Sequence, residues 1–148
     1  MREGLDSARR TFPYEMPYRL LLLAETHLAC GEPDSGIDVI DEALEMATRT
    51  GDRSFEAEFY RVKAELLLNS SRPPAEAEAC LLDSLRIAKE QDAKSFELRS
   101  ATTLAHLWAD NGKRDKAAEL LAPAYDWFSE GFQTPDLKAA RALLDQLT

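Results

Sequence analysis

A set of small residues recurs along the chain at a step of 40 or 41 residues, and this repeat constrains the fold more than any other feature. The string Ser54-Phe55-Glu56 returns as Ser95-Phe96-Glu97. Three further series keep the same step and phase: Ala24, Ala64 and Ala105; Gly36, Ala77 and Ala117; and Ala43, Ser84 and Ala124. Four series in phase indicate one structural unit repeated in tandem.

Each repeat has the pattern of two helices joined by a short turn. In the second half of the first repeat, apolar residues recur at helical spacing as Ile37, Ile40, Leu44 and Ala47. The first helices are predicted over 14–30, 54–69 and 95–111, and the second over 34–50, 74–91 and 114–130. Glycines that suit a left-handed helix end lie near four expected boundaries, at Gly31, Gly51, Gly112 and Gly131. The small residues are predicted to lie at the helix–helix contacts, where only they permit close approach.

The chain therefore divides into three predicted parts. Residues 1–13 are an N-terminal tail, the remnant of a preceding repeat helix, and residues 14–131 are three repeats at 14–50, 54–91 and 95–131. Residues 134–148 are a capping helix, since Thr134 and Pro135 suit its start and leucines follow at helical spacing. The predicted fold class is all-α, a right-handed solenoid of three helix pairs with a C-terminal cap.

Charge and composition exclude several classes of partner. The formal net charge of −9 is unsuited to binding nucleic acid or an anionic membrane. The longest strongly apolar run is far shorter than the roughly 20 residues that cross a bilayer. Two cysteines, Cys30 and Cys80, do not form a disulfide framework, so a reduced, cytoplasmic protein is expected.

No constellation of residues predicts catalysis or a cofactor. His27 and Cys30 lie three apart, a spacing that suits two metal ligands, but a site needs two more and packing roles are favoured. Paired acids such as Asp41-Glu42 are predicted on solvated outer faces rather than in a desolvated cleft. The aromatic residues Tyr125, Trp127, Phe128 and Phe132 are interpreted as core beneath the terminal helix. The prediction is no catalytic residue, no metal and no cofactor.

The order of small and apolar residues within each unit resembles the tetratricopeptide repeat, over about 14–131. The stretches 57–68 and 77–147 also resemble the C-terminal end of large bacterial signalling ATPases, which carry an adenylate cyclase-type or winged-helix DNA-binding domain ahead of the ATPase. This second resemblance implies that the chain is the end of a repeat array in such a regulator. The chain has neither G-x-x-x-x-G-K-[ST] nor G-x-G-x-x-G, so the resemblance implies no cyclase or ATPase activity here.

In a tetratricopeptide array the first helices line a concave groove that binds protein or peptide. Phasing the first helices on their central alanines places twelve side chains in that groove: Tyr18, Leu21, Glu25, Leu28, Glu58, Arg61, Glu65, Leu68, Arg99, Thr102, His106 and Asp110. The Lys and Asn arrangement with which some relatives clamp a C-terminal carboxylate is absent. The alternative is a structural array that self-associates, or senses within its own regulator, without a separate peptide ligand.

The N-terminal end carries the prediction of self-association. Leu20-Leu21-Leu22-Leu23 is apolar on every side of its helix, which indicates that both flanks are covered. One flank is expected to meet an upstream unit of a longer array. A homodimer that covers this flank through Leu20 and Leu22 is therefore predicted.

Overall fold

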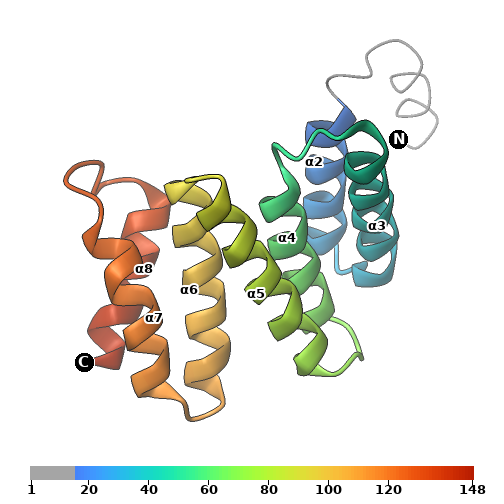
Figure 1. Ribbon diagram of the computed structural model, residues 1–148. Helices are drawn as coiled ribbons and strands as arrows, with labels where there is room; N and C mark the ends of the chain where they lie inside the picture. The colour runs from blue at the N-terminus through green and yellow to red at the C-terminus, as the bar shows by residue number, and fades with distance from the viewer. Residues whose placement is uncertain (1–15) are drawn as a thin grey trace. The chain divides into compact units, whose positions relative to one another are not determined.

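A computed structural model describes residues 16–148, and every regular element in that range is an α-helix (Figure 1). The helices are α2 (Met16–Ala29), α3 (Pro33–Thr50), α4 (Glu56–Leu68), α5 (Pro74–Glu90), α6 (Lys94–Asp110), α7 (Arg114–Asp126) and α8 (Pro135–Leu147). The chain divides into two compact units, Met1–Ala77 and Glu78–Thr148, here called unit 1 and unit 2. The all-α prediction is confirmed, whereas the tail predicted at 1–13 lies outside the described residues.

In unit 1, the helices α2, α3 and α4 come close together at Gly36. α2 and α3 pack along each other, and α4 packs against both. Gly36 lies at this junction, because a Cβ built on it would be 2.5 Å from Leu66 Cδ2 of α4 and 3.3 Å from His27 Cβ of α2. Ala24 and Ala64 are fully buried. The small residues of the repeat therefore lie inside the helix packing, as the sequence predicts.

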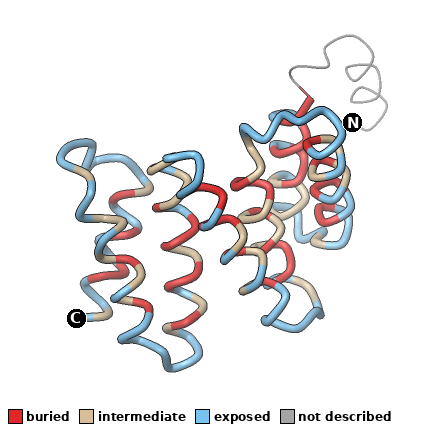
Figure 2. Tube along the Cα trace, in the orientation of Figure 1, coloured by how far each residue is buried: buried red, intermediate tan, exposed pale blue. Residues whose placement is uncertain are grey.

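Unit 2 combines a helix pair with a covering helix. α6 packs along α7, and α8 packs against both. α5 is tied to α6 by two side-chain hydrogen bonds: Ser84 and Ser100 share one of 2.6 Å between buried hydroxyls, and Trp108 Nε1 donates one of 2.8 Å to Glu78 Oε1. Figure 2 shows buried and exposed segments alternating along these helices, the pattern of amphipathic helices around an apolar interior.

The predicted helix ends are mostly present, with two differences. Gly51 ends α3 at φ 76° and donates its N–H to Ala47 O, which is the left-handed termination that glycine favours. α5 ends in the same way at Asp92, whose φ of 54° is one that Asp tolerates better than most side chains. Gly131 also has positive φ, but it ends no helix, since α7 stops at Asp126 rather than at 130.

The expected seventh helix is present as α8. Its apolar face is buried at Leu137, Ala140, Leu143 and Leu144, and Pro135 occupies its first turn. Thr134 lies at the N-cap position with extended backbone, although its side chain makes no capping hydrogen bond. Trp127 and Phe132, interpreted from the sequence as core beneath this helix, are 59% and 43% exposed. That interpretation is wrong, because both residues lie on the connection between α7 and α8 rather than on a helix face.

Candidate functional site

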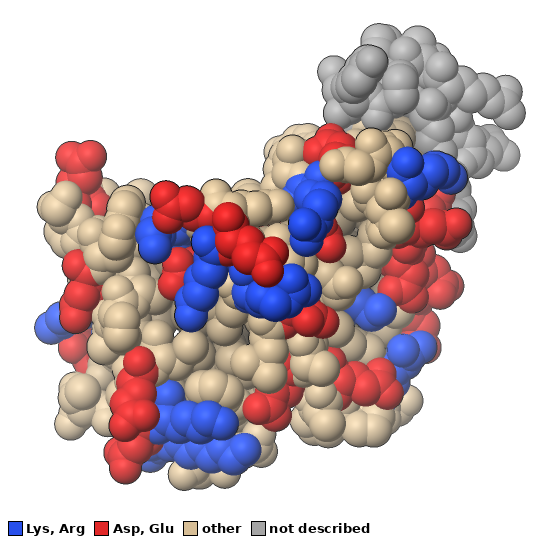
Figure 3. Space-filling view, in the orientation of Figure 1, with Lys and Arg blue, Asp and Glu red and all other residues tan. Residues whose placement is uncertain are grey.

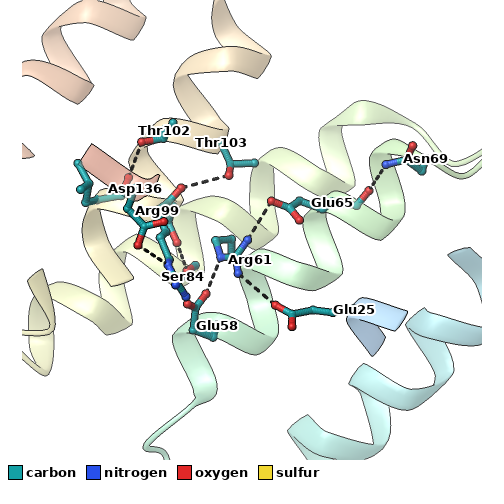
Figure 4. A network of polar contacts seen from close by, with 12 residues as sticks. Glu25, Glu58, Arg61, Glu65, Asn69, Ser84, Arg99, Thr102, Thr103 and Asp136 are labelled. Carbon is teal, nitrogen blue, oxygen red and sulfur yellow. Dashed lines mark hydrogen bonds and ion pairs between the residues drawn. The ribbon is translucent and has the colours of Figure 1, made fainter. Parts of the chain in front are cut away.

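A single arginine of α4 is surrounded by three carboxylates within unit 1 (Figure 4). Arg61 donates from Nε to Glu58 Oε2 at 2.5 Å and from Nη1 to Glu65 Oε1 at 2.9 Å. Its Nη2 lies 3.7 Å from Glu25 Oε1 on α2. The formal charges of these four side chains, one guanidinium and three carboxylates, sum to −2.

The local sequence explains the cluster. Glu58, Arg61 and Glu65 are spaced by three and four residues, which places them on one face of α4. α2 packs against α4 and supplies Glu25 across the contact. Four of the residues predicted to line a groove are thus brought together by the fold. Glu58 is the most buried of them at 1% exposure, and the charge of Arg61 offsets the cost of burying its carboxylate.

Exposed apolar side chains flank the cluster on both helices. Tyr18 and Leu22 precede Glu25 by seven and three residues on α2 and are 51% and 44% exposed. On α4, Leu68 follows Glu65 by three residues and is 38% exposed. Tyr18 is steadied by Phe55, with ring centroids 5.8 Å apart. We call the surface formed by these side chains the α2/α4 face; its members are Tyr18, Leu22, Glu25, Arg61, Glu65 and Leu68.

Three other predicted residues of α2 are less exposed than the members of this face. Leu21 is only 7% exposed and belongs to the core rather than to an open surface. Leu20 is fully buried, so the exposed apolar flank expected at Leu20 and Leu22 is reduced to Leu22. Leu28 is half-buried.

The predicted residues of α6 form a separate row on unit 2. Arg99, His106 and Asp110 are exposed, and Thr102 is half-buried with its hydroxyl donating to Leu98 O at 2.8 Å. Arg99 Nε donates to Asp136 Oδ2 of α8 at 2.8 Å, so the covering helix also fixes this side chain (Figure 4). The row is mixed in charge and has no exposed large apolar residue among its members.

The described residues do not bring a set of metal-ligating side chains together. No group of three or more His, Cys, Asp or Glu side chains in residues 16–148 is placed to hold a metal ion. His27 Nδ1 lies 2.9 Å from Glu32 Oε2, and Cys30 is exposed beside it at the end of α2. Asp41 accepts a hydrogen bond of 2.7 Å from Lys63 Nζ.

An exposed aromatic surface on unit 2 was missed by the sequence analysis. Beside Trp127 and Phe132 lies a hollow of about 210 Å³, lined by residues from α6, α8 and the connection between α7 and α8: Ser95, Leu98, Phe128, Glu130, Gly131, Thr134, Asp136 and Leu137. The signal in the sequence is the polar, glycine-containing stretch Ser129-Glu130-Gly131 between Phe128 and Phe132, which is typical of a connection rather than of a helix.

None of the helices among residues 16–148 is at once long enough and apolar enough to cross a bilayer. On the face shown in Figure 3, acidic and basic side chains of the described residues are interspersed with uncharged ones. A continuous basic surface of the kind that binds phosphates is not present on that face.

Comparison with known proteins leaves the family open. No protein-family model matches this chain, and no curated protein or solved structure matches it.

Proposed function

We propose that this chain is a tetratricopeptide-like, non-catalytic protein-interaction module, working within a larger bacterial signalling or regulatory protein. The α2/α4 face of unit 1 is the binding surface, and its ligand is a peptide segment. The observation that carries the proposal is the Arg61 cluster, an ordered polar centre with a charge of −2 flanked by exposed Tyr18, Leu22 and Leu68.

The chemistry of the face defines the ligand. Glu25 and Glu65 have side chains that are 42% and 30% exposed, so both carboxylates are accessible to a partner. Their accessible negative charge favours a Lys or Arg side chain on the ligand. The exposed aromatic and leucine side chains beside them favour an apolar residue near that cation. The ligand is therefore a segment in which a basic residue lies close to one or two bulky apolar residues.

The side chains of the α2/α4 face are also held in place before a ligand binds, which favours recognition. Arg61 is held by partners on two helices, and Tyr18 packs against Phe55, so both side chains are fixed before a ligand binds. Side chains that are already ordered lose less conformational entropy on binding. The small residues at 24, 36 and 64 support this arrangement, because they bring α2, α3 and α4 together.

Selection from a displayed library of random peptides tests the proposal directly. We expect selection against the whole chain to enrich sequences with Lys or Arg beside aromatic or leucine residues. A selected peptide, made synthetically, should bind Glu25→Gln and Glu65→Gln about 3- to 30-fold more weakly than the wild type, as expected for loss of a charge-assisted contact.

Glu45→Gln is the matched control, since Glu45 is an exposed acid of α3 in the same unit but outside the α2/α4 face. This variant removes the same charge and should bind the peptide as the wild type does. If the selected peptides bind Glu25→Gln and Glu65→Gln with unchanged affinity, the α2/α4 face is not the binding surface.

A further inference from the structure

Shortly before the described part of the chain lies a segment whose composition matches the chemistry of the α2/α4 face. Residues 9–14 read Arg9-Arg10-Thr11-Phe12-Pro13-Tyr14, so two cations precede two aromatic residues and no acid lies between them. The proposed ligand of the α2/α4 face is a basic residue close to one or two bulky apolar residues. The chain therefore carries a segment with the composition of that ligand, next to α2.

On α2 the exposed groups of the face follow one another along a single side of the helix. Tyr18, Leu22 and Glu25 are spaced by four and three residues. With a rise of about 1.5 Å per residue, they lie roughly 3, 9 and 14 Å along the helix axis from Met16. Counted from the start of α2, the apolar part of the face therefore comes first and the carboxylate second.

The segment is long enough to reach these groups by folding back along α2. Phe12 and Arg10 precede Met16 by four and six residues, which span at most about 14 and 21 Å when fully extended. Phe12 can therefore reach the apolar part of the face, and Arg10 can reach Glu25. Counted outward from Met16, the apolar and the charged groups have the same order in the segment and on the helix.

Glu25 can accept a cation of the segment. Its Oε1 lies 3.7 Å from Arg61 Nη2, which is too far for a hydrogen bond, and its side chain is 42% exposed. The formal charges of Arg61 and its three carboxylates sum to −2, whereas residues 9–14 carry +2. Opposite charge thus attracts the segment to the face, and the exposed ring of Tyr18 offers Phe12 an aromatic contact.

We propose that residues 9–14 occupy the α2/α4 face of their own chain, with Phe12 on its apolar part and an arginine beside Glu25. The proposal rests on the proposed function of the face, since an external ligand must displace the segment before it binds. A segment tethered next to its site has an effective concentration of about 1 mM. If the segment alone binds with a dissociation constant of about 0.1–0.5 mM, the tether lowers the affinity for an external peptide about 3- to 10-fold.

The affinity of the full chain for a display-selected peptide tests the proposal. Arg9→Gln/Arg10→Gln removes the cations of the segment and should bind that peptide about 3- to 10-fold more tightly than the wild type. Phe12→Ala leaves the net charge unchanged and should also tighten binding. The matched control is Arg2→Gln/Arg49→Gln, which removes two arginines outside the segment, one of them exposed on α3, and should bind the peptide as the wild type does.

Failure of this proposal differs from failure of the proposed function. If Glu25→Gln weakens peptide binding while neither segment variant tightens it, the α2/α4 face binds peptides but residues 9–14 do not occupy it. Equal tightening in the Arg2→Gln/Arg49→Gln control also overturns the occupation, because the gain is then an effect of net charge. If neither Glu25→Gln nor the segment variants change the affinity, both proposals are wrong.

Occupation of the face can also be measured without an added peptide. The amide chemical shifts of Phe12→Ala should differ from those of the wild type at residues 18–25 of α2 and 65–68 of α4. Differences confined to the neighbours of residue 12 in the sequence would contradict the proposal. In sedimentation velocity at about 10 and 500 µM, the wild type and Arg9→Gln/Arg10→Gln should behave alike, since the contact lies within one chain. A dimer that dissociates in this variant would place the segment on a second copy and overturn the proposal.

Discussion

Gly36 and Leu66 approach so closely that a Cβ on residue 36 would lie 2.5 Å from Leu66 Cδ2, closer than real Cβ atoms come to other atoms. Leu66 is fully buried, so its side chain has little room to yield. The repeat therefore has a small residue at this place in unit 1 because a larger one would clash with α4. Gly36 sets the distance between α3 and α4.

Gly36→Ala should therefore destabilise the protein even though alanine favours helix. The gain in helix propensity is about 1 kcal/mol, and overpacking of a close contact costs about 1–3 kcal/mol. We expect a net loss of about 1 kcal/mol in the free energy of unfolding, measured by urea denaturation. Ser35→Ala, at the exposed neighbouring position, brings a propensity gain without a clash and should be neutral or slightly stabilising. A stabilised Gly36→Ala variant would show that the contact is loose.

Arg61→Met should be strongly destabilising, because it leaves the carboxylate of Glu58 buried without its guanidinium. Breaking a buried pair in this way costs about 3–5 kcal/mol, and adding Glu58→Gln should recover much of the loss. Arg86→Met is the matched control. Arg86 also pairs with acids three and four residues away, but its side chain is 55% exposed, so solvent screens these pairs and Arg86→Met should change the free energy of unfolding little. If Arg61→Met and Arg86→Met lower the free energy of unfolding equally, the Arg61 cluster has no special role in stability.

The covering helix α8 should contribute to stability through its buried leucines. Leu143 is 3% exposed, and Leu143→Ala should lower the free energy of unfolding by about 2–5 kcal/mol. Leu147 is half-buried in the last turn, so Leu147→Ala should lower the free energy of unfolding by clearly less. If both substitutions are neutral in chemical denaturation, α8 does not pack on α6 and α7 as described.

The turn between α3 and α4 predicts a small dependence of stability on pH. The Ser54 hydroxyl and backbone N–H both donate to Asp52 Oδ1, and these hydrogen bonds lower the pKa of Asp52. The stabilisation is therefore present above the unfolded-state pKa of about 3.9, and it disappears as the pH falls through the lower folded-state pKa. Because Asp52 is exposed, Asp52→Ala should cost only about 0.5 kcal/mol or less at pH 7. The difference from wild type should vanish at pH 2–3 in thermal unfolding, and a constant difference would contradict this account.

The positions of the helices could be predicted from the sequence because the repeat and the glycines mark them independently. Gly51 ends α3 as expected, and α8 begins at Pro135. The end of α5 was harder to predict from the sequence, because the residue in the left-handed conformation there is Asp92 rather than a glycine. The early end of α7 could not be predicted, because Trp127 and Phe128 continue its apolar spacing although they lie outside the helix.

The exposure of individual leucines could not be predicted from their local sequence. Within the run Leu20-Leu21-Leu22-Leu23 every residue is equally apolar, so the sequence contains no period that distinguishes one side of the helix. Packing of α3 and α4 against α2 decides the outcome, and Leu22 is the one member of the run left exposed. The same packing turns Leu21 and Glu58 away from the surface that was predicted for them.

Mapping a bound peptide by NMR is the most direct test of the central proposal. The ¹⁵N-labelled full chain would be titrated with the strongest-binding peptide from the display selection, and changes in amide chemical shift would be recorded along the sequence. The account predicts that the largest changes fall on α2 and α4, around Tyr18, Glu25 and Glu65, and that they are lost in Glu25→Gln. Changes confined to the connection between α7 and α8, or spread evenly over the chain, would contradict it.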